Sequence, residues 1–299
     1  LKSDQTNTVF TWLAPTVSGA ITGSSAGTST APSPTIDQAL SITGTSAGTV
    51  TYVVTPDLAG CIGSPVNYVA TVEPIPVISP LSTVDICSGI VFNQTVSADV
   101  PNSTIAWTRA SVTNILPATG TGSNGTVSET LSNAGNTVAG VSYVFTPTGP
   151  ASKNCVGKPV TLTLNVAPAP VISNAVLTGA VCSNNVFNYT ATSNVANASF
   201  AWTRATGTNV TNAAASGNTS AISETLTNTS TQVGSVKYVI TPTGPTPTSC
   251  AGTPSNLDVT VNPLPVITSA NTAITCSNAP FTYTITTGLA TSPTFKWTR

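Results

Sequence analysis

The chain has 299 residues and very little charge: 8 are basic, 9 are acidic, and histidine and methionine are both absent. This composition gives no basic surface for nucleic acid, and without histidine it excludes a Ser-His-Asp triad and an imidazole metal site. No apolar run approaches the roughly 18 residues from which a membrane-spanning helix is inferred. The polar surface must come mainly from Thr, Ser and Asn, which suits extended strands joined by turns.

A 95-residue repeat organises the chain. Four tryptophans occur, each 95 residues after the one before it; they are Trp12, Trp107, Trp202 and Trp297. The sequence AWTRA stands at 106–110 and again at 201–205. A unit of about 95 residues is near the usual size of a domain and longer than the roughly 20–45 residues of a stacking solenoid repeat. We therefore expect separate domains in a row.

Within each repeat the elements follow one order. A Pro-x-Pro stretch comes first, followed by a cysteine corner, an alternating strand and the tryptophan strand. Then come a Ser-Glu-Thr-Leu strand, a tyrosine strand, a second cysteine in a Pro/Gly loop, and a last strand. In the first complete repeat these elements lie at 73–79, 85–89, 91–97, 104–110, 128–133, 141–147, 154–159 and 160–168.

About seven short alternating strands in about 95 residues predict an all-β fold, with each repeat an immunoglobulin-like antiparallel β-sandwich whose strands are lettered A to G. No apolar stripe of helical period is present. The Pro-x-Pro stretches are expected to act as short, stiff linkers. The predicted units are residues 1–74, a partial repeat with strands C to G; 75–168 and 169–263, both complete; and 264–299, a partial repeat with strands A to C.

The tryptophan strand is expected to supply the core. In a strand, residues i and i+2 share a face, so Trp107 and Arg109 point the same way, as do Trp202 and Arg204. The predicted core residues are Trp12, Trp107, Trp202, Trp297, Tyr52, Tyr143 and Tyr238. Each Arg is expected at the rim, laid against an aromatic ring, although an Arg that grips a carboxylate or a sugar is the alternative. Ala14 occupies the matching place in the first unit, which favours the packing role.

Neither the acids nor the cysteines form a pattern typical of catalysis or metal binding. Glu129 and Glu224 recur at one place, but one acid per unit is half of a two-carboxylate site, so we expect solvent-facing strand residues. The acids are dispersed, and the cysteines lack C-x-x-C spacing, so we predict no metal and no cofactor. We therefore do not expect an enzyme.

The six cysteines are periodic and favour disulfides formed in an oxidising, extracellular setting. Three precede the last strand, and three lie at the corner between strands A and B; they are Cys61, Cys155 and Cys250, and Cys87, Cys182 and Cys276. Pairing within a unit would give Cys87–Cys155 and Cys182–Cys250. The two positions lie at opposite ends of a sandwich, about 30 Å apart, whereas a disulfide needs Cα atoms within about 7 Å. A bond across the linker, Cys87–Cys250, is therefore favoured, with within-unit pairing and free thiols left open.

The combined motifs resemble a known repeat class. The order Cys-Ser-Gly/Asn, Phe-x-Trp-Thr-Arg-Ala, Ser-Glu-Thr-Leu-x-Asn, Tyr-Val-x-Thr-Pro and Val-x-Val-Asn-Pro-x-Pro is similar to that of the PKD-like and Ig-like repeats of giant Bacteroidota cell-surface proteins. Many of those proteins are linked to type IX secretion, gliding or adhesion. The resemblance covers essentially the whole chain and implies a β-sandwich stalk outside a bacterial cell, with no stated ligand.

Three functions are compatible with these patterns. The favoured one is a non-catalytic structural stalk segment of a long extracellular adhesin or surface filament. Its expected partners are the neighbouring repeats of the same chain, and contact with identical chains in a filament is left open. The alternatives are repeats that bind glycan or a partner chain directly, and a spacer within a secreted multidomain enzyme. A surface low in charge repels neighbouring chains weakly, which leaves lateral assembly open.

Both ends of the sequence fall inside a repeat, so we expect a window on a longer array. A different interpretation is strand complementation, in which the A–B–C piece at the end of one chain completes the first unit of the next. Both ends already contain the tryptophan strand, and this overlap argues against it.

Overall fold

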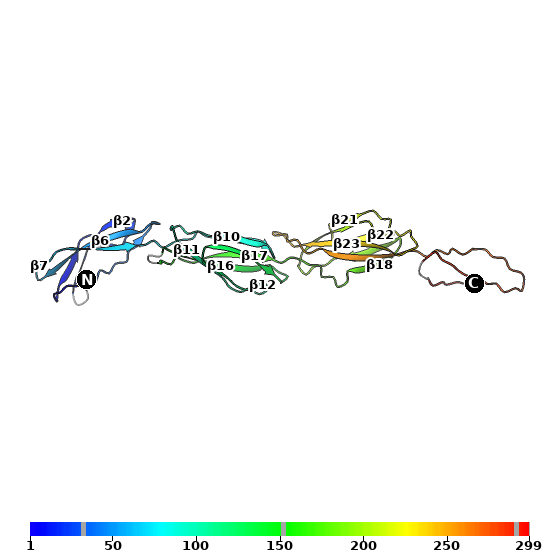
Figure 1. The fold of residues 1–299 in the computed structure, drawn as a ribbon, viewed down its shortest axis with the longest axis horizontal. Helices are drawn as coiled ribbons and strands as arrows, with labels where there is room; N and C mark the ends of the chain where they lie inside the picture. Colours follow the sequence, from blue (N-terminus) through cyan, green and yellow to red (C-terminus); the bar gives the residue numbers. More distant parts are fainter. Residues whose placement is uncertain (31–33, 151–153, 290–292, 299) are drawn as a thin grey trace.

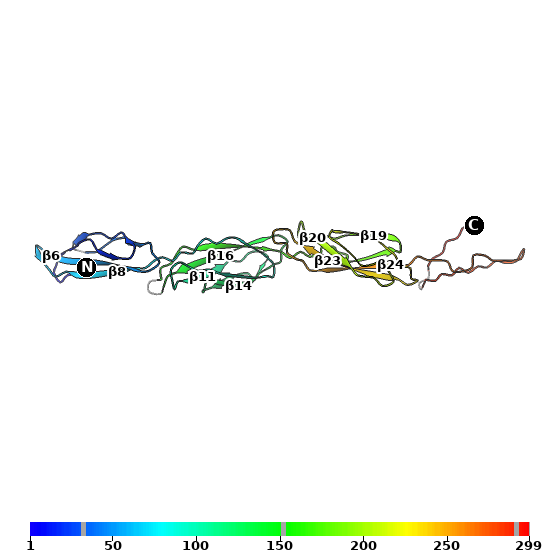
Figure 2. The ribbon, with the colours of Figure 1, turned by 90° about the horizontal axis from the view of Figure 1, so that it is seen from above.

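A computed structural model describes residues 1–30, 34–150, 154–289 and 293–298. All regular secondary structure in these ranges is β-strand. Three β-sandwiches lie end to end in a narrow rod, and the residues after 263 extend beyond the third (Figures 1 and 2). We call residues 1–74 unit 1, 75–168 unit 2, 169–263 unit 3, and 264–299 the C-terminal segment.

Unit 2 is a complete sandwich. Its strands are β9 (Val84–Cys87), β10 (Val91–Thr95), β11 (Thr104–Arg109), β12 (Ile115–Leu116), β13 (Gly120–Gly122), β14 (Thr126–Thr130), β15 (Ser132–Asn133), β16 (Ala139–Thr148) and β17 (Val160–Ala167). One layer has the order β13-β11-β16-β17-β9, and the other pairs β10 with β14, with β12–β15 as a short extra pair. Alternating residues of both layers point inward, as expected for a sandwich.

Unit 3 repeats this plan. Its strands are β18 (Thr178–Cys182), β19 (Asn185–Thr190), β20 (Ser199–Arg204), β21 (Ala215–Gly217), β22 (Ala221–Leu226), β23 (Gly234–Thr243) and β24 (Ser255–Asn262). The layers have the orders β18-β24-β23-β20-β21 and β19-β22. The first strand of each complete unit runs parallel to the last, since Cys87 pairs with Ala167 and Cys182 with Asn262. The sandwich is therefore antiparallel except for this one pair of strands.

Unit 1 has the later strands of the same plan. They are β1 (Val9–Trp12), β2 (Thr16–Ser18), β3 (Ile21–Thr22), β4 (Gly27–Thr30), β5 (Ser41–Ile42), β6 (Gly48–Leu58), β7 (Cys61–Ile62) and β8 (Val66–Val72). β6 lies at the centre of the main sheet and pairs with β1, β2, β7 and β8. In units 2 and 3 the last strand is also paired with a first strand, whereas β8 pairs with β6 alone in the described residues.

Each unit has its own apolar core, and the predicted core residues occupy it with one exception. Trp12, Trp107 and Trp202 are buried, and so are Tyr52, Tyr143 and Tyr238. Trp297 is 79% exposed, so the expectation for this residue is wrong. The described residues after Asn262 form no strand, although strands A to C were expected there. Trp107 is covered because its strand, β11, pairs with β13 and β16, whereas the described residues around Trp297 form no strand.

Candidate functional site

Each buried tryptophan faces a glycine on the neighbouring strand. Trp107 pairs with Gly122 across β11 and β13, and Trp202 pairs with Gly217 across β20 and β21. A Cβ built on Gly217 would lie 2.7 Å from ring atoms of Trp202, closer than real Cβ contacts. The indole therefore lies flat over the glycine backbone. The glycine stands 15 residues after the tryptophan in all three units, at positions 27, 122 and 217, a spacing that could have been read from the sequence.

The arginine of the tryptophan strand lies inside the sandwich. Arg109 is 2% exposed and donates from Nε and Nη2 to the two carboxylate oxygens of Glu129, at 3.0 and 3.2 Å. Its Nη1 donates to the backbone oxygen of Ala118 at 3.0 Å. The Tyr143 hydroxyl donates to Glu129 Oε2 at 2.7 Å, and the guanidinium carbon lies 5.9 Å from the centre of the Tyr143 ring. The donors and acceptors of this buried ion pair are thus matched within the unit.

Unit 3 builds the same cluster. Arg204 donates to Glu224 at 2.8 and 3.0 Å and to the backbone oxygen of Ala213 at 2.9 Å. The Tyr238 hydroxyl donates to Glu224 Oε2 at 2.6 Å. The expectation of a ring contact for the arginine is confirmed, but the expected rim position is wrong. The expectation that the glutamate faces solvent is also wrong, since the Glu129 and Glu224 side chains keep only 14% and 17% of their exposure.

Unit 1 has a neutral version of the cluster. Ala14 stands in place of the arginine and Gln38 in place of the glutamate. The Tyr52 hydroxyl donates to Gln38 Oε1 at 2.7 Å, and Gln38 Nε2 donates to the backbone oxygen of Ser25 at 2.8 Å. The loss of the cation is therefore accompanied by loss of the anion. Sequence reasoning noticed the alanine and missed the glutamine, although both were visible in the repeat.

The pKa values of all three members of the cluster in unit 3, and of Tyr143 in unit 2, are shifted. Burial alone would raise the pKa of Glu224, but hydrogen bonds from Arg204 and Tyr238, together with the charge of Arg204, lower it below 4.5. The hydrogen bond to Glu224 is the main cause that raises the pKa of Arg204. Burial, followed by the bond to the glutamate, raises the pKa of Tyr143 and of Tyr238. The cluster of unit 3 therefore holds a fixed ion pair, not a group ready to exchange protons near neutral pH.

A disulfide crosses the linker between units 2 and 3. Cys87, at the corner after β9, is bonded to Cys250, in the loop before β24, with Cα atoms 5.5 Å apart. The bond across the linker is therefore present, and the within-unit pairs Cys87–Cys155 and Cys182–Cys250 are not. Within-unit pairing fails because the corner and the loop of one unit lie at opposite ends of the sandwich. Linear stacking brings the corner of unit 2 against the loop of unit 3.

Backbone hydrogen bonds fix the corner that carries Cys87. Ser88 N donates to Ala167 O at 2.8 Å, and the Ser88 hydroxyl accepts from Asn133 N at 2.9 Å. The buried Asn133 side chain donates to Val166 O at 2.8 Å. Ser183 and Asn228 form the equivalent arrangement in unit 3. The corner is thus held by the strands on both sides of it, and this fixes the direction in which the Cys87 side chain points.

The loop that carries Cys250 is held against the linker. Gly252 N donates to Pro242 O, and Gly244 N donates to Cys250 O, both at 2.8 Å. A Cβ built on Gly252 would collide with the backbone oxygen of Pro170 in the linker. Glycine at this place therefore lets the loop lie directly on the chain that enters its own unit. The Cys-x-Gly spacing recurs at 61–63 and 155–157.

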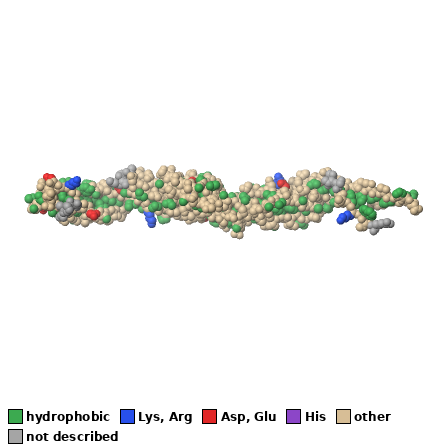
Figure 3. Space-filling view, turned by 90° about the horizontal axis from the view of Figure 1, so that it is seen from below, with side chains coloured by type: hydrophobic (Ala, Val, Ile, Leu, Met, Phe, Trp, Pro, Cys, Tyr) green, Lys and Arg blue, Asp and Glu red, His purple; other side chains and the backbone are tan. Residues whose placement is uncertain are grey.

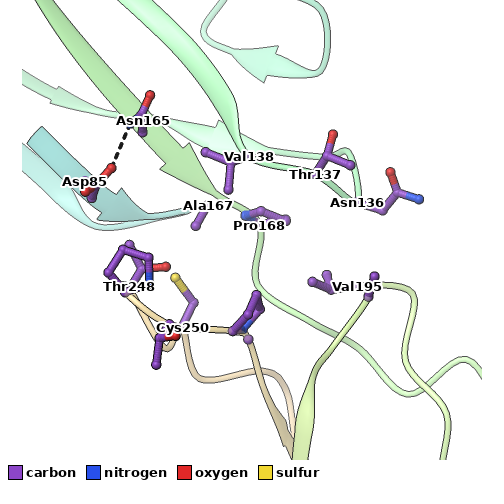
Figure 4. A pocket seen from close by; sticks show the side chains of 15 residues that line it. Asp85, Asn136, Thr137, Val138, Asn165, Ala167, Pro168, Val195, Thr248 and Cys250 are labelled. Atoms are coloured by element: carbon purple, nitrogen blue, oxygen red, sulfur yellow. Dashed lines mark hydrogen bonds between the residues drawn. The ribbon is translucent and has the colours of Figure 1, made fainter. Parts of the chain in front are cut away.

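A shallow crevice lies beside the disulfide at the junction of units 2 and 3. Its volume is about 230 Å³, below the roughly 300–1,000 Å³ of usual ligand sites. Figure 4 shows Val138 and Pro168 on one side and Val195 and Cys250 on the other, with Asp85 held by the Asn165 amide at 2.8 Å. The exposed surface of the crevice is mostly apolar, and Asp85, the one charged side chain in its lining, is already hydrogen-bonded to Asn165, so the crevice fits a packed junction better than a binding pocket.

The other cysteines and the surface charges form no further site in the described residues. Cys61, Cys155, Cys182 and Cys276 are free thiols, and all but Cys155 are exposed. Among the described residues, no group of three potential metal ligands comes together, and no helix could cross a membrane. Charged side chains are few and scattered on the face shown in Figure 3. The exposed pair Lys237–Asp258, at 3.8 Å, adds little stability.

These features define a tandem array of β-sandwiches with a covalent bond between neighbours. The model of the PKD-like domain family matches residues 1–76, 84–170 and 179–265, and the chain belongs to this family. The sequence matches none of the curated proteins with which it was compared.

Several multidomain structures have a similar fold. The titin I-band fragment I67–I69 is 9% identical, with a TM-score of 0.39, and the match covers 87% of this chain and all of that one. The chicken CNTN1 FN1–FN3 domains are 9% identical, with a TM-score of 0.28, covering 86% of this chain and 89% of that one. The first two Ig domains of DIP-gamma are 13% identical, with a TM-score of 0.33, covering 64% and 98%.

Proposed function

We propose that the chain is a non-catalytic stalk segment of a long extracellular protein on a bacterial cell surface, an adhesin or a filament, that holds other parts away from the cell. The shape of the molecule supports a spacer, because the units extend in one line (Figure 2). The disulfide is suited to an oxidising compartment. The adhesin role and the Bacteroidota origin rest on the sequence resemblance.

The disulfide between units is the observation that carries this proposal. Tension applied to the two ends of the chain reaches Cys87, crosses to Cys250, and continues toward the C-terminus. Most of unit 2 and most of unit 3 lie between these residues and are bypassed by the covalent link. A stalk benefits from such a link, because a stretched chain then keeps most of its length folded.

Aromatic side chains favour a spacer over a glycan-binding module. The two complete units contain nine aromatic residues, and every one of them is buried or partly buried. They are Phe92, Trp107, Tyr143, Phe145, Phe187, Tyr189, Phe200, Trp202 and Tyr238. Repeats that bind sugar through stacked rings would present aromatic faces to solvent in each unit.

Pulling single molecules by their two ends tests the proposal. The bond spans 163 residues, so at about 3.3–3.6 Å each it should hide roughly 540–590 Å of extended chain. We expect this length to be released when a reductant is added or when C87S/C250S is pulled. The variant C182S/C276S serves as a control that keeps the bond and should behave like the unchanged chain. Equal extension with and without reductant would refute the proposed tension path.

A further inference from the structure

Neighbouring units contain nearly the same strands. The sequence AWTR occurs in β11 and in β20, and the sequence SETL occurs at 128–131 and at 223–226. The units are also tethered, so each strand meets the strands of the neighbouring unit at a high effective concentration. Assembly of one domain from the strands of two neighbours is a characteristic misfolding of repeat proteins. The array therefore needs contacts that distinguish one unit from the next.

The contact between the two layers of the sandwich differs between units 1 and 2. In unit 2, Arg109 lies on β11 of the five-stranded layer and Glu129 lies on β14 of the other layer, so their ion pair joins the layers. Unit 1 has Ala14 and Gln38 at these positions, and the Tyr52 hydroxyl donates to Gln38 instead. The same place in the core is thus charged in one unit and neutral in its neighbour.

Exchange of strands between units 1 and 2 would separate the two charges. Arg109 would then face Gln38, and Glu129 would face the methyl group of Ala14. The guanidinium is 2% exposed in its own unit, so water cannot replace the missing carboxylate. A buried charge that has lost its partner is strongly destabilising. The exchanged sandwiches are therefore disfavoured at both places.

The ion pair does not distinguish units 2 and 3, because both contain it, but the contact between their first two strands does. Phe187 of β19 lies on Gly179 of β18, where a Cβ would be 2.6 Å from Cε2 of the ring. Val84 of β9 stands at the matching place in unit 2, since Val84 pairs with Leu164 as Gly179 pairs with Val259. The phenylalanine thus meets a glycine in one unit and a valine in the other.

The two phenylalanine rings are oriented differently as a result. The ring of Phe92 in unit 2 is at 39° to that of its neighbouring tyrosine, whereas the ring of Phe187 in unit 3 is at 24° and is stacked. In the position that it has in unit 3, Phe187 would collide with Val84. Phe92 would leave unfilled space above Gly179. Exchange between units 2 and 3 therefore costs packing in both sandwiches.

We propose that these differences make the strands of each unit specific for the other strands of that unit and keep neighbours from exchanging them. The charged or neutral pair acts between units 1 and 2. The contact of phenylalanine with valine or glycine acts between units 2 and 3. Both contacts lie in the interior, so they select the correct partner when the layers close during folding. The role concerns assembly of the array and does not depend on the stalk function.

Repeated stretching and relaxation of single molecules in reductant, which opens the disulfide, tests the role of the charged pair. Correctly folded units should unfold one at a time, whereas two units that have exchanged strands should unfold in one combined step. A14R/Q38E gives unit 1 the pair of unit 2, and R109A/E129Q gives unit 2 the pair of unit 1. Each variant should raise the frequency of combined steps about tenfold or more.

The variant with all four substitutions separates specificity from stability. It exchanges the two versions of the pair, so units 1 and 2 differ again and the frequency of combined steps should return to that of the unchanged chain. Simple loss of stability would instead add up over the four changes. No rise in the two-residue variants, or a frequency that stays high with all four substitutions, would overturn the role of the pair.

The same measurement tests the contact that distinguishes units 2 and 3. A combined step of these units, about 190 residues, should release roughly 620–680 Å of chain. V84G and G179V each make the two units alike at this contact and should raise the frequency of such steps about tenfold. V84G/G179V exchanges the two versions and should restore the low frequency. A frequency in the double variant as high as in the single variants, or no change in any of the three, would refute this part of the proposal.

Discussion

Arg204 and Glu224 show how one residue pair sets the stability of a unit. The guanidinium is nearly inaccessible and meets both carboxylate oxygens, so removal of either partner leaves an uncompensated charge in the sandwich. The pair is not essential to the fold itself, because unit 1 has Ala14 and Gln38 at the two positions in the repeat and forms its sandwich without either charge. A unit can therefore contain both the arginine and the glutamate or neither of them, but not one charge alone.

We expect Arg204→Ala to destabilise unit 3 by about 2–4 kcal/mol, less than for a wholly buried pair because the Glu224 side chain retains some exposure. The double variant R204A/E224Q reproduces the neutral pair of unit 1 and should recover at least half of the loss. Hydrogen exchange measured by mass spectrometry reports each unit separately and would give both values. Equal losses in the single and double variants would show that the guanidinium acts through packing and not through charge.

Unit 3 should lose stability at both ends of the pH scale. The pKa of Glu224 is below 4.5 in the folded unit, so the unfolded chain binds more protons as the pH falls through that range, and acid favours unfolding. The pKa of Tyr238 is raised, so the unfolded tyrosine ionises first as the pH rises above 10, and alkali also favours unfolding.

The expected result is a plateau of stability between about pH 5 and pH 10, with E224Q removing the contribution of Glu224 to the acid side. Unit-resolved hydrogen exchange, corrected for the intrinsic pH dependence of exchange, would measure it. Unit 1 is an internal control because Gln38 does not titrate, so this position adds no acid dependence there. An unchanged acid side in E224Q would contradict the assignment to this carboxylate.

At the scale of elements, the edge strand that covers each tryptophan depends on one glycine. β13 and β21 are only three residues long, and each places a glycine against the indole. This close approach of the glycine backbone to the indole ring lets a short edge strand pack against the core. A larger residue in place of the glycine would push the edge strand away from the ring. Cross-strand pairs of this kind are the main source of sheet stability.

We expect Gly122→Ala to destabilise unit 2 by about 1–3 kcal/mol, since a methyl group would lie 2.6 Å from Cε2 of the buried Trp107 ring. Gly140→Ala in β16 is the matched control, because its nearest neighbour would be an Asn165 oxygen at 3.7 Å. Denaturant unfolding followed by the fluorescence of Trp107, with the other tryptophans replaced by phenylalanine, would compare them. A loss as large in the control would indicate a general cost of removing glycine from a strand.

The elements were predicted well where their pattern is local. Alternation identified the strands around Trp107 and Tyr143, because period two is a property of the strand itself. The pattern did not indicate that β9 runs parallel to β17, because pairing direction depends on which strand is the neighbour. The strands expected after residue 263 are not formed for the same reason, since a strand needs a neighbouring strand to pair with as well as an alternating sequence.

The whole molecule is shaped by its junctions. The junction of units 2 and 3 has a linker, a crevice and the Cys87–Cys250 bond, whereas Cys155 at the preceding junction is a free thiol. The disulfide is a second connection between units 2 and 3, separate from the linker. It therefore limits bending of the rod at this junction.

We expect C87S/C250S to bend more at this junction than the unchanged chain, which small-angle X-ray scattering would detect as a shorter average length and a broader distance distribution. The stability of the individual units should change little, because neither residue belongs to the central core of its sandwich. The variant C182S, which leaves the bond in place, is the control. Identical scattering from all three proteins would show that the linker packing alone keeps the rod straight.

The sequence by itself determined the repeat, the unit length, the strand order and the class of fold, because tryptophan spacing, alternation and turn residues are encoded locally. It also favoured the Cys87–Cys250 bond, because the two ends of a sandwich are too far apart for the alternative. Only the tertiary structure decided that Arg109 is buried beside Glu129, since a strand pattern gives the face of a residue and not what lies opposite it. It also decided that Trp297 is exposed, because burial requires strands on either side of a residue, and the described residues around Trp297 form none.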